Sequence, residues 1–156
     1  MNWIGLPENY DNIFGFVYLI KNNHPESNKK YYIGCKQCKK RIKRKPLKGK
    51  TRNRIDYVDN DVQDYWGSNK ELIQDIQKYG IENFSREIIE ICDSKFHLRY
   101  AEAHWQILTN AILDKRFYNG ILNVRLGKVP SNFKNIQRDI SKLNIDIINC
   151  HYTMDM

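Results

Sequence analysis

The chain has 156 residues, of which 41% are hydrophobic and 12% aromatic, and its 26 Lys and Arg against 18 Asp and Glu give a formal net charge of +8. This length and composition predict one globular domain with a short tail and exclude a disordered chain. No apolar run approaches the roughly 18 residues that span a bilayer. The four scattered cysteines are too few for a secreted disulfide framework, so we expect a cytoplasmic protein with reduced thiols.

The first two predicted elements are β-strands. Residues 16–20 and 31–34 are rich in β-branched and aromatic side chains. The stretch between them is polar and contains Pro25 and several asparagines. We therefore expect a β-hairpin with a long loop.

A strongly basic segment follows, from Lys36 to Arg54. It holds eleven basic residues and no acidic one, which leaves 15 basic against 18 acidic residues elsewhere. Because a dense positive segment binds a polyanion by releasing counterions, we predict a nucleic acid as the partner. A solvated flexible loop or a localisation-like basic run is the alternative. The predicted DNA-binding residues are Lys36, Lys39, Lys40, Arg41, Lys43, Arg44, Lys45, Lys48, Lys50, Arg52 and Arg54.

Within this segment, Pro46 and Gly49 are unfavourable in a helix interior. Any helix here should therefore be short and end by about Lys45. Much of the basic segment is expected to be loop.

The next predicted element is a helix. Ser68 and Glu71 have the spacing of a capping box, apolar residues follow at helical spacing up to Tyr79, and Gly80 comes just past the end. This pattern predicts a helix that is capped by Ser68 and stopped at Gly80.

A third strand and a second helix are predicted after it. The apolar residues of 84–92 indicate a strand packed against the first two. A helix should then run from about Ser94 to about Asp114, capped by Asp93 or Ser94. Its apolar face would hold Leu98, Ala101, Trp105 and Leu108.

The end of the chain is predicted to be a separate tail. Gly127, Pro130 and Ser131 mark a boundary, which gives a domain over 14–127 and a tail over 128–156. Apolar residues recur in the tail at helical spacing, which predicts one amphipathic helix that docks on the domain. These residues are Ile136, Ile140, Leu143 and Ile147.

Five short motifs stand in order between roughly residues 14 and 127. They are Phe16-Val17-Tyr18, Tyr32-Ile33-Gly34, Lys78-Tyr79-Gly80 with Phe84, Glu102 with Trp105, and Tyr118-Asn119. Their order and approximate spacing make the chain similar to the GIY-YIG endonucleases, which implies DNA, most simply double-stranded, as the partner. A nuclease needs a group that positions water, cations that neutralise the phosphate and usually a carboxylate-bound metal.

This resemblance implies an α+β fold, with a small three-stranded antiparallel sheet flanked by helices. It also implies hydrolysis of DNA with a divalent ion, Mg²⁺ or Mn²⁺, bound by Glu102. Tyr18 would be the general base or water-positioning phenol, and Tyr32 its partner at the scissile phosphate. Asn119 matches the late asparagine of the family, with Asn123 as an alternative.

The family arginine that follows the second motif has no direct match, because Ile42 stands at its place. Since phosphoryl transfer needs a cation near the phosphate oxygens, we expect Lys36, Arg41 or Arg44 to serve, with Arg86 as a further candidate. The Gly34-Cys35-Lys36-Gln37 and Asp64-Tyr65-Trp66-Gly67-Ser68 segments resemble a phage-associated branch, so a homing or phage nuclease is expected.

Two alternatives remain open. Cys35 and Cys38 form a CxxC pair, but no second closely spaced pair accompanies it, so a zinc site is disfavoured. The missing arginine also leaves room for a nucleic-acid-binding protein that kept the fold and lost the cutting.

Overall fold

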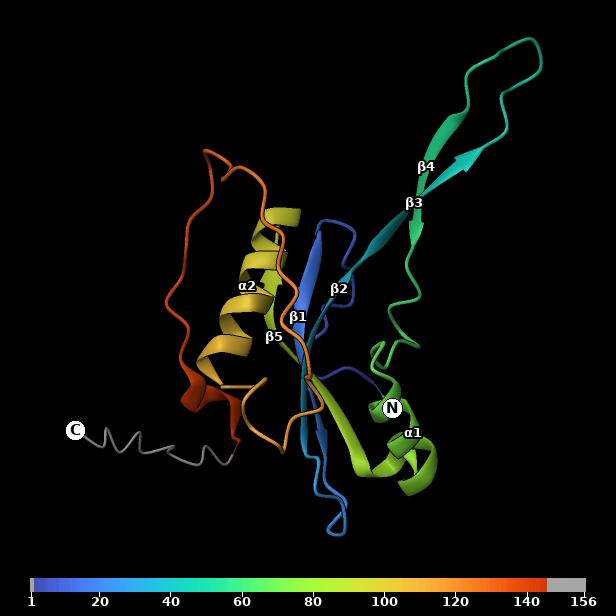
Figure 1. Ribbon diagram of the computed structural model, residues 1–156. Helices are drawn as coiled ribbons and strands as arrows, with labels where there is room; N and C mark the ends of the chain where they lie inside the picture. The colour runs from blue at the N-terminus through green and yellow to red at the C-terminus, as the bar shows by residue number, and fades with distance from the viewer. Residues whose placement is uncertain (1, 146–156) are drawn as a thin grey trace.

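The computed structural model describes residues 2–145, and its centre is a three-stranded antiparallel sheet (Figure 1). The strands are β1 (Gly15–Asn22), β2 (Tyr31–Gln37) and β5 (Phe84–Cys92), in the order β2-β1-β5. The central strand β1 is buried from Gly15 to Ile20, which explains its continuous apolar sequence. The predicted hairpin, the third strand and the α+β class are confirmed.

Two helices cover opposite faces of this sheet. Val17 of β1 faces the core shared with α2 (Lys95–Leu108), whereas its neighbour Tyr18 faces the core shared with α1 (Lys70–Tyr79). Trp3 joins the second core, where its ring meets the edges of the Phe16 and Tyr18 rings. The sheet is therefore buried on both sides.

Helix α1 ends as predicted but begins one residue later than predicted. Its N-cap is Asn69, whose Oδ1 accepts a hydrogen bond from the amide of Leu72 at 3.0 Å, so the prediction of Ser68 as the cap was wrong. Gly80 ends the helix with φ of 92°, a conformation that favours glycine. A short 3₁₀ turn, η1 (Ile81–Asn83), then leads into β5.

Helix α2 begins at the predicted cap and ends early. Ser94 accepts a hydrogen bond from the amide of His97, as a helix N-cap does. The predicted extension to Asp114 was wrong, because the chain turns at Thr109 and Asn110. The hydroxyl of Thr109 bonds back to the carbonyl of Trp105 at 2.8 Å, and Asn110 takes a left-handed conformation with φ of 55°.

The basic segment forms a two-stranded antiparallel ribbon that projects from the body (Figure 1). Its strands are β3 (Lys39–Arg44) and β4 (Arg54–Asp59). The prediction that much of the basic segment is loop is confirmed for residues 45–53, which have no regular secondary structure, and was wrong for β3. Neither strand has a buried residue, which is why the sequence lacks the alternation that predicts a half-buried strand. Cys38 anchors the base of this ribbon through backbone hydrogen bonds to Phe14 and Asn60.

The tail packs on the domain without forming the predicted helix. It runs without regular secondary structure beside α2 and ends in a single 3₁₀ turn, η2 (Ile140–Leu143), so the prediction of an amphipathic helix was wrong for the described part (Figure 1). Arg138 and Leu143 are buried, Arg138 against Glu90 of β5 and Leu143 in the core shared with α2. Ile147 of the predicted stripe lies outside the described residues.

Within residues 2–145, no helix has the length and apolar character that crossing a bilayer requires.

Candidate active site

A pocket of about 500 Å³ opens at the edge strand β2, between the N-terminus of α1 and the middle of α2. We call it the β2-edge pocket. It brings together three of the residues that the sequence proposed, Tyr32, Glu102 and Asn119. The remaining lining residues are Ser68, Asn69, Lys70, Glu71, Gln106, Tyr118, Gly120 and Ile121.

Glu102 supplies a carboxylate to this pocket from α2. The side chain is half-buried, and one oxygen accepts a hydrogen bond from Gln106 at 3.3 Å. Among residues 2–145, no lysine, arginine or histidine lies within ion-pair distance of it. The thiol of Cys35 lies next to it, and burial, followed by this negative charge, raises the pKa of that thiol. The carboxylate therefore faces the pocket without a cationic partner.

Tyr18 and Tyr32 lie side by side on the α1 face of the sheet, but only Tyr32 lines the pocket. Tyr18 is fully buried, and burial, followed by the neighbouring Tyr32 and Tyr65, raises its pKa well above the ordinary tyrosine value. Burial also raises the pKa of Tyr32. Gly34 makes room for this pair, because a Cβ there would collide with the Tyr18 hydroxyl. Both phenols are thus protonated near neutral pH.

Asn119 fixes β2 at the pocket floor. Its Oδ1 accepts from the amide of Ile33 at 3.0 Å, and its Nδ2 donates to the carbonyl of the same residue at 2.7 Å. Gln106 of α2 donates to that carbonyl as well, at 3.1 Å. Both ends of the Asn119 amide are therefore used by the backbone of the strand that carries Tyr32.

The N-terminus of α1 forms the opposite wall, which the sequence did not reveal. Ser68 lies beside the phenol of Tyr32. Asn69 caps the helix and also donates to the carbonyl of Tyr118 at 3.0 Å, and Lys70 is exposed at the rim. Unpaired amides and the helix dipole make such a terminus positive. The capping pattern predicted a helix start here, but only the fold turns it toward Tyr32.

The candidate cations for the missing family arginine lie outside this pocket. The ammonium of Lys36 sits 3.9 Å from the ring centroid of Tyr65, and burial lowers its pKa. Arg41 and Arg44 lie on the projecting ribbon, where Arg44 pairs with Asp56 at 3.0 Å. Arg86 is buried and donates to the backbone carbonyls of residues 63 and 65. The structure therefore gives Arg86 a packing role.

A second cluster of potential metal ligands is formed by Glu90, Cys92 and His97, whose ligand atoms lie within 4.8 Å of one another. Arg138 occupies this cluster, because its guanidinium donates to both oxygens of Glu90 at 2.7 and 2.8 Å. Trp105 and His97 bond to the same carboxylate. A buried cation beside the carboxylate disfavours a metal ion, so this cluster does not fit a metal site.

Comparison with known proteins agrees with this arrangement. Residues 4–122 match the family model described as "Putative endonuclease segE, GIY-YIG domain". The chain is also 31% identical over 115 residues to "Putative endonuclease segB" of Enterobacteria phage T4, an alignment that covers 74% of this chain. The chain spans only about two fifths, 39%, of that relative's length. No solved structure matches the chain. A family match over most of the chain, with residues of three motifs in one pocket, shows that the chain belongs to the phage-type GIY-YIG endonucleases.

Proposed function

We propose that this protein hydrolyses DNA phosphodiester bonds in the β2-edge pocket, with a divalent ion, Mg²⁺ or Mn²⁺, held by Glu102. The observation that carries the proposal is the meeting of a phenol, an unpaired carboxylate and a helix N-terminus in one pocket. These groups match the needs of phosphodiester hydrolysis: a polar group for water, a metal ligand and positive potential for the phosphate. Its phage relative supports a homing or phage role in the cytoplasm of an infected cell.

The residues of this pocket fit a hard divalent cation. Magnesium takes oxygen ligands and is commonly held by one or two carboxylates while keeping several waters. Glu102 offers one carboxylate without a cationic partner among the described residues. Glu71 lies at the rim, where its exposed carboxylate is 4.0 Å from the ammonium of Lys29. Bound there, the ion would lower the pKa of a coordinated water and neutralise phosphate charge. Space of about 500 Å³ leaves room for water and a phosphate group.

Tyr32 is assigned the contact with the attacking water or the scissile phosphate. Its phenol lines the pocket beside Ser68, at the start of α1. Tyr18 lies behind it with no exposed surface and supports it through the buried phenol network. The amides at the start of α1, with Lys70, would face the non-bridging oxygens.

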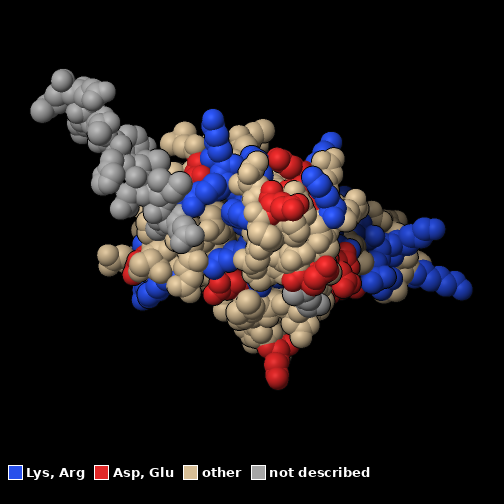
Figure 2. All heavy atoms as spheres, turned by 90° about the horizontal axis from the view of Figure 1, so that it is seen from below, with Lys and Arg blue, Asp and Glu red and all other residues tan. Residues whose placement is uncertain are grey.

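The projecting ribbon is assigned the contact with double-stranded DNA. Lys39, Lys40 and Arg44 are paired with aspartates, whereas Arg41 and Lys43 of β3 have no ion pair among the described residues. Seen from below, basic side chains extend beyond the body on the side where the ribbon projects (Figure 2). Since the major groove admits a two-stranded ribbon, this shape and charge suit duplex DNA.

The test is a supercoiled-plasmid nicking assay with Mg²⁺ or Mn²⁺. Glu102→Gln should slow cutting at least about 100-fold, because metal binding contributes several kcal/mol to the transition state. Glu82→Gln is the matched control, since this exposed glutamate lies past the far end of α1, about 15 Å from the pocket. A parent chain that binds plasmids without cutting any would favour the alternative of a binding protein that lost catalysis.

A second comparison separates the two phenols. Tyr32→Phe should lower the cutting rate about 100-fold with little change in stability, because the hydroxyl is used at the substrate. Tyr18→Phe should lower the unfolding free energy by about 1 kcal/mol, since its hydroxyl is fully buried. It should lower the cutting rate less than Tyr32→Phe does. A larger rate loss in Tyr18→Phe than in Tyr32→Phe would return the general-base role to Tyr18.

A further inference from the structure

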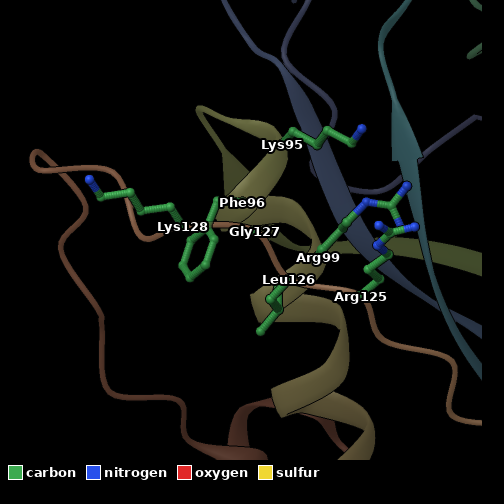
Figure 3. Close-up of a pocket in the computed structure, with 7 residues that line it drawn as sticks. All are labelled: Lys95, Phe96, Arg99, Arg125, Leu126, Gly127 and Lys128. Atoms are coloured by element: carbon green, nitrogen blue, oxygen red, sulfur yellow. The ribbon is translucent and has the colours of Figure 1, made fainter.

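A second pocket, lined largely by cations, lies at the N-terminal half of α2. It has a volume of about 650 Å³ and we call it the α2 basic pocket. Helix α2 and residues 125–128, which have no regular secondary structure, form its two walls. Figure 3 shows Arg99 and Arg125 with their guanidinium groups close together, Lys95 pointing to the same side and Lys128 to the other. The lining residues are Lys95, Phe96, Arg99, Arg125, Leu126, Gly127 and Lys128.

The positive charges of this pocket have no partner within residues 2–145. In that part of the chain, the side chains of Arg99, Arg125, Lys95 and Lys128 have neither a hydrogen bond nor an ion pair. Two guanidinium groups brought together without a carboxylate repel each other. An anion between them would remove this repulsion, and arginine forks bind phosphate through paired hydrogen bonds.

Aromatic side chains of α2 and the tail pack together at the wall of this pocket. Phe96 packs against the rings of Tyr100 and Phe133, with centroid distances of 6.0 and 5.0 Å. Phe133 belongs to the tail, so the tail and α2 hold each other at the pocket. The apolar wall lowers the local dielectric, which strengthens the field of the cations on its rim.

The α2 basic pocket lies between Glu102 and the ribbon. Arg99 precedes Glu102 by about one helical turn, and the charges of both act on the Cys35 thiol of β2. At the other side, Gly15 pairs with both Gln37 and Cys92, so the start of α2 and the start of the ribbon lie at the same end of the sheet. A strand of DNA that touches the ribbon and reaches Glu102 would pass this pocket.

We propose that the α2 basic pocket is a second phosphate-binding site, in which Arg99 and Arg125 hold the DNA backbone on the ribbon side of the phosphate that is cut. The assignment rests on the proposed function, because it takes DNA as the substrate. Neither arginine is part of the family motifs in this sequence. The pocket supplies cations beside the β2-edge pocket, at a place where no sequence motif indicated any.

The test measures duplex binding in EDTA, where no cutting occurs, as a function of salt. The double variant Arg99→Gln/Arg125→Gln should bind more weakly, and the slope of log K against log salt should fall by about 0.9 for each phosphate that the variant no longer neutralises. The control Lys115→Gln/Lys142→Gln removes the same charge from exposed positions outside the pocket. Equal slopes and affinities in the two double variants would overturn the proposal.

A second measurement identifies the anion. In the Glu102→Gln chain, the NMR signals of the Arg99 and Arg125 side chains should shift when a short duplex is added. Millimolar inorganic phosphate should leave them nearly unchanged. Signals that saturate with inorganic phosphate and ignore the duplex would make this a small-anion site and overturn the DNA assignment, as would no shift with either.

These outcomes are separate from those of the nicking assay. Loss of the duplex-dependent shift with normal cutting would remove the second site and leave the proposed function intact. A normal shift in a chain that cuts no plasmid would support the second site and remove the nuclease.

Discussion

Asn119 shows how a residue of a functional motif can act through the backbone. Its side-chain amide bonds to both the N–H and the carbonyl of Ile33. This double hydrogen bond gives a structural reason for an asparagine at this position of the motif. Asn119→Ala should lower the unfolding free energy by about 2 kcal/mol, because the buried amide of Ile33 would have no partner. Urea unfolding checks the value, with exposed Asn123→Ala as the control.

The outcome also separates two roles for this asparagine. A chain with Asn119→Ala that is as stable as the parent and yet fails to cut would give Asn119 a direct contact with substrate. Stability and cutting that fall together would support its role in holding β2.

Sequence predicted only part of the site at the level of single residues. Tyr32 and Glu102 were found because their motifs stand in family order, and the fold does bring them to one pocket. Ser68 and Arg99 were not found, since their roles depend on where two helices point rather than on their neighbours in sequence. Lys36 was predicted as a pocket cation, but its ammonium lies on the ring of Tyr65.

At the level of elements, α1 offers a direct test of its corrected start. Asn69→Ala should cost about 1 kcal/mol or more, because it removes the cap on Leu72 and the bond to the Tyr118 carbonyl. Ser68→Ala should change the unfolding free energy by less than about 0.5 kcal/mol, since this exposed residue caps nothing. Urea titrations of both variants decide the point: an equal cost would restore Ser68 as the cap.

The elements that sequence predicted well are those with a buried stripe and a clear stop. Strand β5 and helix α1 have both, and Gly80 ends the helix where expected. The β3–β4 ribbon was missed because none of its residues is buried, so its pairing leaves no hydrophobic period to recognise. The early end of α2 was missed because Asn110 reads as an ordinary helix residue until its left-handed conformation is known.

At the scale of the whole molecule, one buried ion pair joins the tail to the domain. Arg138 of the tail and Glu90 of β5 form a two-bond pair, and the side chains are 0% and 4% exposed. His104 of α2 also bonds to the guanidinium, at 2.9 Å. A buried pair of this kind contributes little in net terms, but removing one partner leaves a costly charge. The tail is therefore held by a contact that depends on the ionisation of Glu90.

The pH dependence of stability should report this contact. Burial raises the pKa of Glu90, but hydrogen bonds from Arg138, His97 and Trp105 outweigh it and leave the pKa below the ordinary value. A lowered carboxyl pKa stabilises the fold above the unfolded value of about 4.3, and this stability is lost as pH falls through the folded pKa. Burial and the charge of Arg138 also lower the pKa of His104. The fold therefore loses further stability as the pH falls below about 6.5, the value for histidine in the unfolded chain.

Arg138→Met tests this linkage. At pH 7 the variant should lose about 3 kcal/mol of unfolding free energy, because Glu90 stays buried without its cation. Without Arg138, burial dominates and the pKa of Glu90 rises. Acid therefore neutralises an unfavourable buried charge in the variant, whereas in the parent it breaks a favourable ion pair. The stability gap should therefore narrow between pH 7 and pH 3 in urea titrations, with exposed Lys142→Met as the control. A gap that stays constant over this range would mean that the ion pair with Arg138 does not affect the protonation of Glu90.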